Sequence, residues 1–255
     1  METVFHLEGA CRSFGAVRAL REVDLTVEKG ERVALIGASG SGKTTLLRLI
    51  GAQLAPDAGA VRVMESDPLG LGEGGLRHLR SRLAFLPQDL GLVPNLRVIQ
   101  NVVAGRCGRR SLWGTLRDLI LPGVEARREI FALLERVGIA EKMYDRLDTL
   151  SGGQRQRVAV ARALFQEPVA LLADEPVSAV DPARARNLLE LLSQLCEEEG
   201  LTLVVSMHQL ELAKEFFPRL VGLKEGRVTF DGSTGELSED QLTELFRLEG
   251  GGGAG

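Results

Sequence analysis

The sequence has 255 residues, of which 44% are hydrophobic, so it can form one large domain, or a domain with a subdomain, around a sizeable core. The formal net charge of -4 argues against a general electrostatic grip on nucleic acid, and we expect no nucleic-acid partner. Cys11, Cys107 and Cys196 show no metal-ligand spacing, which indicates reduced thiols. No apolar run approaches the roughly 18–20 residues of a transmembrane helix, and residues 1–6 lack the pattern of a signal peptide.

The first part of the chain predicts short strands around a polar loop. Residues 3–8 and 23–27 are alternating or apolar and predict strands, and Phe14 falls in the loop between them. The ring of Phe14, with Val17 beside it, offers a flat apolar face to an adenine base. The alternative is that Phe14 packs on the sheet, and its position alone favours neither interpretation.

The strongest local pattern is Gly-Ala-Ser-Gly-Ser-Gly-Lys-Thr at residues 37–44. An apolar run at 33–36 predicts a buried strand before it, and residues 45–50 predict a helix after it, which is the context of a P-loop. Glycines let the backbone wrap a polyphosphate, and the helix N-terminus adds partial positive charge. We predict that Lys43 reaches the β- and γ-phosphates and that Thr44 binds Mg²⁺. The residues assigned to the nucleotide here are Gly37, Ser39, Gly40, Ser41, Gly42, Lys43, Thr44 and Thr45.

The middle of the chain changes character. A turn at 56–59, a strand at 61–63, a loop with a short helix at 67–81 and a buried strand at 83–86 come first. Residues 89–150 then predict a mostly helical insertion between strands of the core, with helices at 96–103 and 125–137.

The last part of the chain predicts further strands and helices in alternation. A helix at 155–165 is followed by an apolar run that ends in Asp174 and Glu175, as a central parallel strand does when its end faces a site. Asp181 and Pro182 begin the next helix, and a strand at 201–205 ends near His208. A helix at 211–217, strands at 220–223 and 227–230, and a Gly-rich, disordered tail follow. The alternation predicts an α/β fold with a parallel sheet.

In order, these motifs closely resemble the nucleotide-binding subunit of ABC transporters. The resemblance rests on residues 37–44, Gln88, Leu-Ser-Gly-Gly-Gln at 150–154, Asp174-Glu175, residues 178–181 and His208. It implies an ABC-type P-loop NTPase with a RecA-like parallel-sheet core, a small antiparallel β subdomain and a helical subdomain. The domain would span 1–245, with the helical subdomain at about 89–156, and 246–255 would be the tail.

The resemblance also implies roles for single residues. Asp174 matches the Mg²⁺-holding aspartate, Glu175 the glutamate that polarises the attacking water, and His208 the histidine that contacts the γ-phosphate. Gln88 matches the glutamine that touches Mg²⁺ and moves with the transmembrane partner, and Phe14 falls where the family stacks adenine. The resemblance therefore implies catalytic roles for Glu175, His208, Gln88 and Lys43, metal ligation by Thr44, Gln88 and Asp174, and nucleotide contacts from Phe14, Val17, Ser151, Gly152, Gly153, Gln154 and Asp181.

Residues 151–154 would bind the nucleotide of a second subunit, which implies a homodimer in the ATP-bound state. The resemblance further implies transmembrane permease subunits and, indirectly, a periplasmic or extracellular substrate-binding protein. The chain would lie peripherally at the cytoplasmic face of the inner membrane. Leu92, Val93 and Leu96 either accept a helix of the membrane protein or pack locally.

Within the family, residues 90–93, 101–106, 111–113, 172–176 and 207–209 look most like the ATPase of phosphonate importers. Pro87 and residues 89–91 depart from that pattern, and these departures lie in the loop that meets the membrane partner. The leading hypothesis is an ATPase that energises uptake of phosphonate or a related phosphorus oxyanion. The alternatives are a non-transport ABC ATPase in a soluble complex, or an ABC transporter ATPase for another solute.

Overall fold

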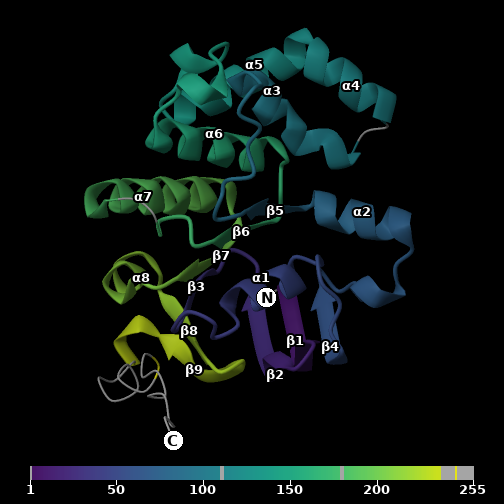
Figure 1. Cartoon of the computed structure of the whole chain (residues 1–255), viewed down its shortest axis with the longest axis vertical. Helices are drawn as coiled ribbons and strands as arrows, with labels where there is room; N and C mark the ends of the chain where they lie inside the picture. The colour runs from purple at the N-terminus through teal and green to yellow at the C-terminus, as the bar shows by residue number, and fades with distance from the viewer. Residues whose placement is uncertain (1, 110–111, 179–180, 237–244, 246–255) are drawn as a thin grey trace, which may run out of the picture.

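The computed structural model describes residues 2–109, 112–178, 181–236 and 245, which form two sheets and a group of helices at one end (Figure 1). The strands are β1 (Thr3–Phe14), β2 (Val17–Glu28), β3 (Arg32–Ile36), β4 (Ala58–Val63), β5 (Leu83–Leu86), β6 (Ala170–Asp174), β7 (Thr202–Met207), β8 (Arg219–Lys224) and β9 (Arg227–Ser233). The α-helices are α1 (Lys43–Ile50), α2 (Glu73–Ser81), α3 (Val98–Val103), α4 (Leu112–Ile120), α5 (Val124–Arg136), α6 (Gly152–Phe165), α7 (Pro182–Glu199) and α8 (Leu210–Phe216). Short 3₁₀ helices lie at Pro68–Gly70, Ala104–Arg109, Ala140–Lys142, Leu147–Thr149 and Thr234–Glu236.

The larger sheet has the order β5-β6-β7-β3-β8-β9, so β3 is central between β7 and β8. Its strands run parallel except for β9, which pairs antiparallel with β8. In Figure 1 the sheet descends from β5, nearest the helical end, to β9, farthest from it. Because β5, β6, β7 and β3 are parallel, the residues that follow them gather at one edge, and this edge carries the predicted site.

Alternate residues of each parallel strand face opposite sides of the sheet, as a period of two requires. Ala34 and Ile36 of β3 join a core with the helices α3, α5, α6 and α7. Val33 and Leu35 join a second core with α1 and the smaller sheet. The sheet is therefore covered on both faces at β5, β6, β7 and β3, which explains why these strands are almost entirely buried, whereas the antiparallel strand β9 at the sheet edge is partly exposed.

The smaller sheet is antiparallel, with the order β2-β1-β4. Its strands correct one expectation, because most of the predicted polar loop is strand. Phe14 is the last residue of β1 and pairs with Val17, the first residue of β2, across a hairpin turn. The polar side chains misled the prediction because one side of these strands is partly exposed and has no core to face.

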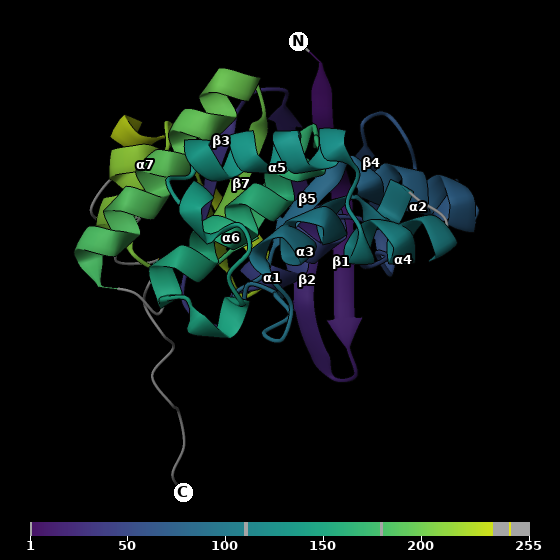
Figure 2. The same ribbon diagram turned by 90° about the horizontal axis from the view of Figure 1, so that it is seen from above.

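The helical insertion forms as predicted and lies at one end of the molecule, with α3, α4, α5 and α6 seen together from above in Figure 2. The predicted boundary at 156 falls inside α6, which begins at Gly152 and continues to Phe165 without interruption. The predicted Gly-rich tail and residues 179–180 lie outside the described residues. Among the residues that are described, we find no helix with the length and apolar character needed to span a bilayer.

Candidate functional site

The P-loop connects β3 to α1 and requires two of its glycines. Gly37 has φ +148°, and a Cβ there would lie 2.2 Å from the carbonyl oxygen of Leu223. Gly42 has φ +108°, and a Cβ there would lie 2.5 Å from the carbonyl oxygen of Ala19. The loop therefore packs so closely on its neighbours that no side chain fits at either position.

Several polar groups at this loop have no hydrogen-bond partner among the described residues. Ser41 Oγ is buried without a hydrogen-bond partner among the described residues. The N–H groups in the first turn of α1, which begins at Lys43, have no partner inside the helix. Gly40, by contrast, borders open space. These donors and this space fit a bound polyphosphate.

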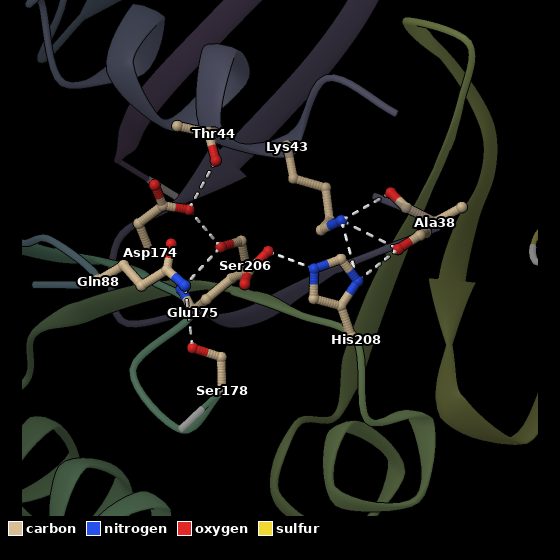
Figure 3. Close-up of polar contacts among 10 residues, drawn as sticks. Ala38, Lys43, Thr44, Gln88, Asp174, Glu175, Ser178, Ser206 and His208 are labelled. Carbon is tan, nitrogen blue, oxygen red and sulfur yellow. Dashed lines mark hydrogen bonds and ion pairs between the residues drawn. The ribbon is translucent and has the colours of Figure 1, made fainter. Parts of the chain in front are cut away.

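Lys43 is folded back onto its own loop. Its Nζ donates to the carbonyl oxygens of Gly37 and Ala38, each at 2.9 Å, and lies 3.5 Å from Nδ1 of His208 (Figure 3). Burial lowers the pKa of Lys43, and the charges of Glu175 and Asp174 partly offset that effect. The ammonium is thus held at the site by groups that a phosphate can replace.

Asp174 ends β6 and is buried. One of its carboxylate oxygens, Oδ1, accepts hydrogen bonds from Thr44 at 3.0 Å and from Ser206 at 2.7 Å. The hydroxyl and carboxylate oxygens of Thr44 and Asp174 are the ligand type that Mg²⁺ prefers. In the described part of the chain, no group of three or more His, Cys, Asp or Glu side chains is placed to hold a metal ion.

Glu175, which follows Asp174, has an unusual backbone conformation. Its φ of 47° lies in the left-handed region. A residue other than glycine is strained in this conformation and keeps it only where the surrounding structure holds it. Its N–H donates to Oγ of Ser206 at 2.9 Å, and its carboxylate contacts Nε2 of His208. Nδ1 of His208 lies 3.2 Å from the carbonyl oxygen of Gly37, so His208 bridges the P-loop and Glu175 (Figure 3).

Ser206 is a site residue that the sequence prediction missed. It lies in β7, is fully buried, and contacts both Asp174 and the backbone of Glu175. A detectable signal was present, because a serine continues an otherwise apolar strand at 201–205. Buried hydroxyl groups require a partner, and this one holds the carboxylate of Asp174 and the backbone of Glu175.

Gln88 follows β5 and lies beside the same edge of the sheet. Its Nε2 donates to Oγ of Ser178 at 3.2 Å. Gln88, Glu175 and Ser178 line a cavity of about 340 Å³ together with Gly152, the first residue of α6. The structure thus brings Gln88 next to Glu175 and to Gly152 of the predicted signature segment, which is Leu-Ser-Gly-Gly-Gln at residues 150–154.

A second cavity, of about 400 Å³, lies between the P-loop and β2. It is lined by Val17, Gly40, Gly42, Lys43, Thr44 and Thr45, among others. Val17 is 66% exposed and Phe14 is 46% exposed, but Phe14 is not among the lining residues. The guanidinium of Arg12 lies 5.0 Å from the centre of the Phe14 ring. Ser39 is exposed on the loop.

Another cavity, of about 530 Å³, lies at the opposite edge of the sheet, beside Cys196 and Arg219. It contains no predicted site residue. Within the described residues, Cys11, Cys107 and Cys196 are not in disulfide bonds.

The signature residues and Asp181 begin helices. Ser151 accepts a hydrogen bond from the N–H of Gln154 at 3.3 Å, and the Gln154 side chain accepts one from the Ser151 N–H at 2.9 Å, which forms a capping box. Ser151 and Gly152 are exposed, and Gly153 is partly exposed. Asp181 caps α7 by accepting from the N–H of Arg184 at 3.1 Å. None of these residues lines the 400 Å³ cavity at the P-loop.

Comparison with known proteins gives consistent matches over most of the chain. A family model described as "ABC transporter" matches residues 20–178. The chain is 45% identical to "Phosphonates import ATP-binding protein PhnC 2" of Albidiferax ferrireducens, over 91% of this chain and 83% of that protein. It is also 45% identical to "Phosphonates import ATP-binding protein PhnC 1" of Pseudomonas syringae pv. syringae, over 91% of this chain and 86% of that protein.

Solved structures share the fold. CbiO1 from Clostridium perfringens, part of the ABC transporter complex cbiONQ, matches with a TM-score of 0.81 and 25% identity, covering 96% of this chain and 94% of that one. The dimeric ATP-binding cassette MJ0796 bound to ADP and Pi matches with a TM-score of 0.77 and 31% identity, covering 90% and 98%.

Proposed function

This chain belongs to the ABC transporter family, and we propose that it is the ATP-hydrolysing subunit of an importer for phosphonate or a related phosphorus oxyanion. The observation that carries the proposal is the 45% identity to phosphonate import ATP-binding proteins over 91% of the chain. The geometry at the sheet edge supports an ATPase, because it unites a phosphate-binding loop, a cation-binding pair of oxygens and a glutamate beside a histidine.

The residues present fit ATP and Mg²⁺. The P-loop amides and Lys43 hold the phosphates, and Thr44, Asp174 and Gln88 hold the ion. When bound, Mg²⁺ neutralises the charge that develops on the transferred phosphoryl group. Val17 lies at the cavity where the adenine would bind, whereas Phe14 does not line that cavity and has Arg12 beside its ring.

Glu175 and His208 perform the chemistry in this proposal. Glu175 accepts a hydrogen bond from the attacking water and orients it, as a positioned carboxylate does in general-base catalysis. His208 already contacts both Glu175 and the P-loop, so it lies where a γ-phosphate would be recognised. Ser206 fixes Asp174 and the backbone of Glu175 in their separate positions.

The exposed signature supports a shared site. The start of α6 carries free N–H groups and a positive helix end, which bind an anion well. Because Ser151, Gly152, Gly153 and Gln154 do not line the cavity at the P-loop of their own chain, we assign them to the nucleotide of a second copy. Asp181, which caps α7, belongs to the same facing surface in this proposal. ATP thus joins two copies into a homodimer.

The remaining assignments follow from this function. Residues 1–245 form the ATPase domain, with a helical part at about 89–156. The chain works at the cytoplasmic face of the inner membrane, held by transmembrane permease subunits that receive solute from a substrate-binding protein. The loop from Gln88 to Leu96 meets the permease, and nucleic acid has no part in the function.

Co-purification from native membranes in mild detergent, followed by mass identification, tests the proposal. We expect a stoichiometric polytopic membrane protein, and we expect a phosphonate-loaded binding protein to stimulate ATP hydrolysis of the reconstituted complex. A binding protein loaded with an amino acid is the control. Soluble partners alone would contradict transport, and stimulation by another solute class would contradict the phosphonate assignment.

A further inference from the structure

The segment that follows Gln88 is pinned at two places by side chains of the helical end. Val93 exchanges hydrogen bonds with the buried amide of Asn101 in α3, at 2.8 and 3.1 Å. Upstream, the guanidinium of Arg162 in α6 donates to the carbonyl oxygens of Leu90 at 2.7 Å and Gly91 at 2.5 Å. The segment therefore cannot move relative to α3 and α6 without breaking these hydrogen bonds.

The geometry of the turn at Leu90 and Gly91 suits the guanidinium of Arg162. Leu90 and Gly91 have φ of 64° and 55°, which turns their consecutive carbonyl oxygens toward one guanidinium. A planar fork of donors suits two such acceptors, whereas the point charge of a lysine does not. A Cβ at Gly91 would lie 3.2 Å from Pro87 and 3.5 Å from Nη2 of Arg162, so the turn is in van der Waals contact with this side chain.

The backbone of Arg162 is also held in place by a close neighbour. A Cβ at Gly105 would lie 2.3 Å from the carbonyl oxygen of Arg162, so the 3₁₀ segment Ala104–Arg109 packs directly on the backbone of α6. Burial lowers the pKa of Arg162, partly offset by Asp89, and no carboxylate of the described residues lies within ion-pair distance. Withdrawing the two carbonyl oxygens would leave a partly buried cation with unsatisfied donors, which is costly.

The other end of α6 carries the predicted signature. Arg162 lies roughly 16 Å along the helix from Ser151, at 1.5 Å per residue. Figure 1 shows α6 as one continuous helix beneath α3 and α5, next to the sheet. Near its start, Gln156 donates to the carbonyl oxygen of Pro176, the residue after Glu175, at 3.2 Å. One rigid helix thus connects the Gln88 segment, the signature and the catalytic edge.

We propose that Arg162 is a positioning residue that ties the Gln88 segment to the signature helix, so that the two move as one unit. Its consequence for transport rests on the proposed function: a membrane partner that displaces residues 88–91 also displaces Ser151 through α6. Within the isolated chain, Arg162 acts on ATP hydrolysis through the position of Gln88 and makes no contact with the nucleotide.

A double-mutant cycle on the full chain tests this assignment. We expect Arg162→Met to lower kcat for ATP hydrolysis about tenfold, because a displacement of about 1 Å at a catalytic group has effects of this order or larger. The KM for ATP should stay within about twofold, because the P-loop is unchanged. Gln88→Ala should lower kcat similarly, and the double variant should lose no more than either single variant.

Arg157→Met is the matched control. Arg157 lies on the same helix and donates to a backbone carbonyl oxygen, that of Val137, which lies outside the Gln88 segment. Its effect on kcat should add to that of Gln88→Ala. Hydrogen exchange should rise in peptides covering 88–93 for Arg162→Met but not for Arg157→Met. Arg162→Lys, which retains the charge, should fold and give an intermediate kcat.

The outcomes separate the two proposals. Additive losses from Gln88→Ala and Arg162→Met, or unchanged exchange at 88–93, would overturn the role of Arg162. A wild-type chain that binds no ATP and hydrolyses none would overturn the proposed function instead. In that case the exchange comparison still decides whether Arg162 holds the segment.

Discussion

Asp174 and Glu175 are neighbours in the sequence, but their carboxylates have different surroundings. Asp174 is buried and accepts hydrogen bonds from two hydroxyl groups. Glu175 turns away through a positive φ and contacts His208. These surroundings support the proposed roles, in which Asp174 holds a cation and Glu175 orients a water molecule, and the positive φ of Glu175 separates the two carboxylates.

At the same scale, Cys196 gives a prediction that depends on pH. Burial raises the pKa of the Cys196 thiol from 9.0 to about 12. Because the pKa is higher in the folded chain, the thiol's contribution to the free energy of unfolding is complete below pH 9 and is lost as the pH rises from 9 toward 12. Urea unfolding at several pH values should show this decline, and Cys196→Ala should show less of it.

Labelling with iodoacetamide at neutral pH provides an independent measurement. The partly exposed Cys11 and Cys107 should react in the native chain, whereas the buried and protonated Cys196 should react only after denaturation. If native Cys196 reacted as fast as Cys11, the burial seen here would be contradicted. An equally large loss of stability with rising pH in Cys196→Ala would contradict it as well.

At the scale of elements, α6 and α7 begin with the same device. The side chains of Ser151 and Asp181 each accept a hydrogen bond from the N–H of the residue three positions later. A capping box and an Asp-Pro start are local patterns, and both helices begin at these residues. The start of α6 is exposed as well as capped, which leaves its remaining N–H groups available to a ligand.

Ser151→Arg tests the role of this helix start. A bulky cation in place of the cap should abolish ATP hydrolysis, because it blocks the surface that meets the second nucleotide. ATP binding to the P-loop should stay within about twofold, since Ser151 does not line that cavity. Equilibrium binding and steady-state hydrolysis measure the two effects.

Ser151→Thr retains a capping hydroxyl and is the control, with hydrolysis close to that of the wild type. If Ser151→Arg also lost ATP binding, the signature would belong to the same site as Lys43, and the division of the site between two copies would be wrong.

At the scale of the whole molecule, the large sheet separates two cores. One joins it to α3, α5, α6 and α7, and the other to α1 and the smaller sheet. The predicted site lies at the sheet edge where both layers end. The P-loop precedes α1 in one layer, and residues 151–154 begin α6 in the other, so the two helices lie on opposite faces of the large sheet.

Glu175→Gln is expected to report on the assembly of two molecules. The amide cannot accept the water's proton, so hydrolysis should fall by about 10²–10⁴ while Mg-ATP still binds. The nucleotide-bound dimer should accumulate, and size-exclusion chromatography with light scattering should detect it. Glu141→Gln, an exposed residue of the 3₁₀ helix Ala140–Lys142 that lines neither cavity at the site, is the control and should hydrolyse ATP normally. A variant that binds Mg-ATP but stays monomeric would contradict the shared site.

The sequence by itself determined the P-loop, the strand that ends in Asp174, the start of α7 at Asp181 and the order of strands and helices. These features depend on neighbouring residues, through hydrophobic periodicity, glycine backbone freedom and helix caps. The family resemblance added Glu175, His208 and Gln88, which local patterns alone would not have assigned.

Only the tertiary structure decided how distant residues meet. Thr44 and Asp174 are 130 positions apart, and their contact depends on β3 and β6 lying in one parallel sheet. The same packing buries Ser206 against Asp174 and brings Arg162 to Leu90 and Gly91. No local pattern encodes these contacts, because each arises when two independently formed elements pack together.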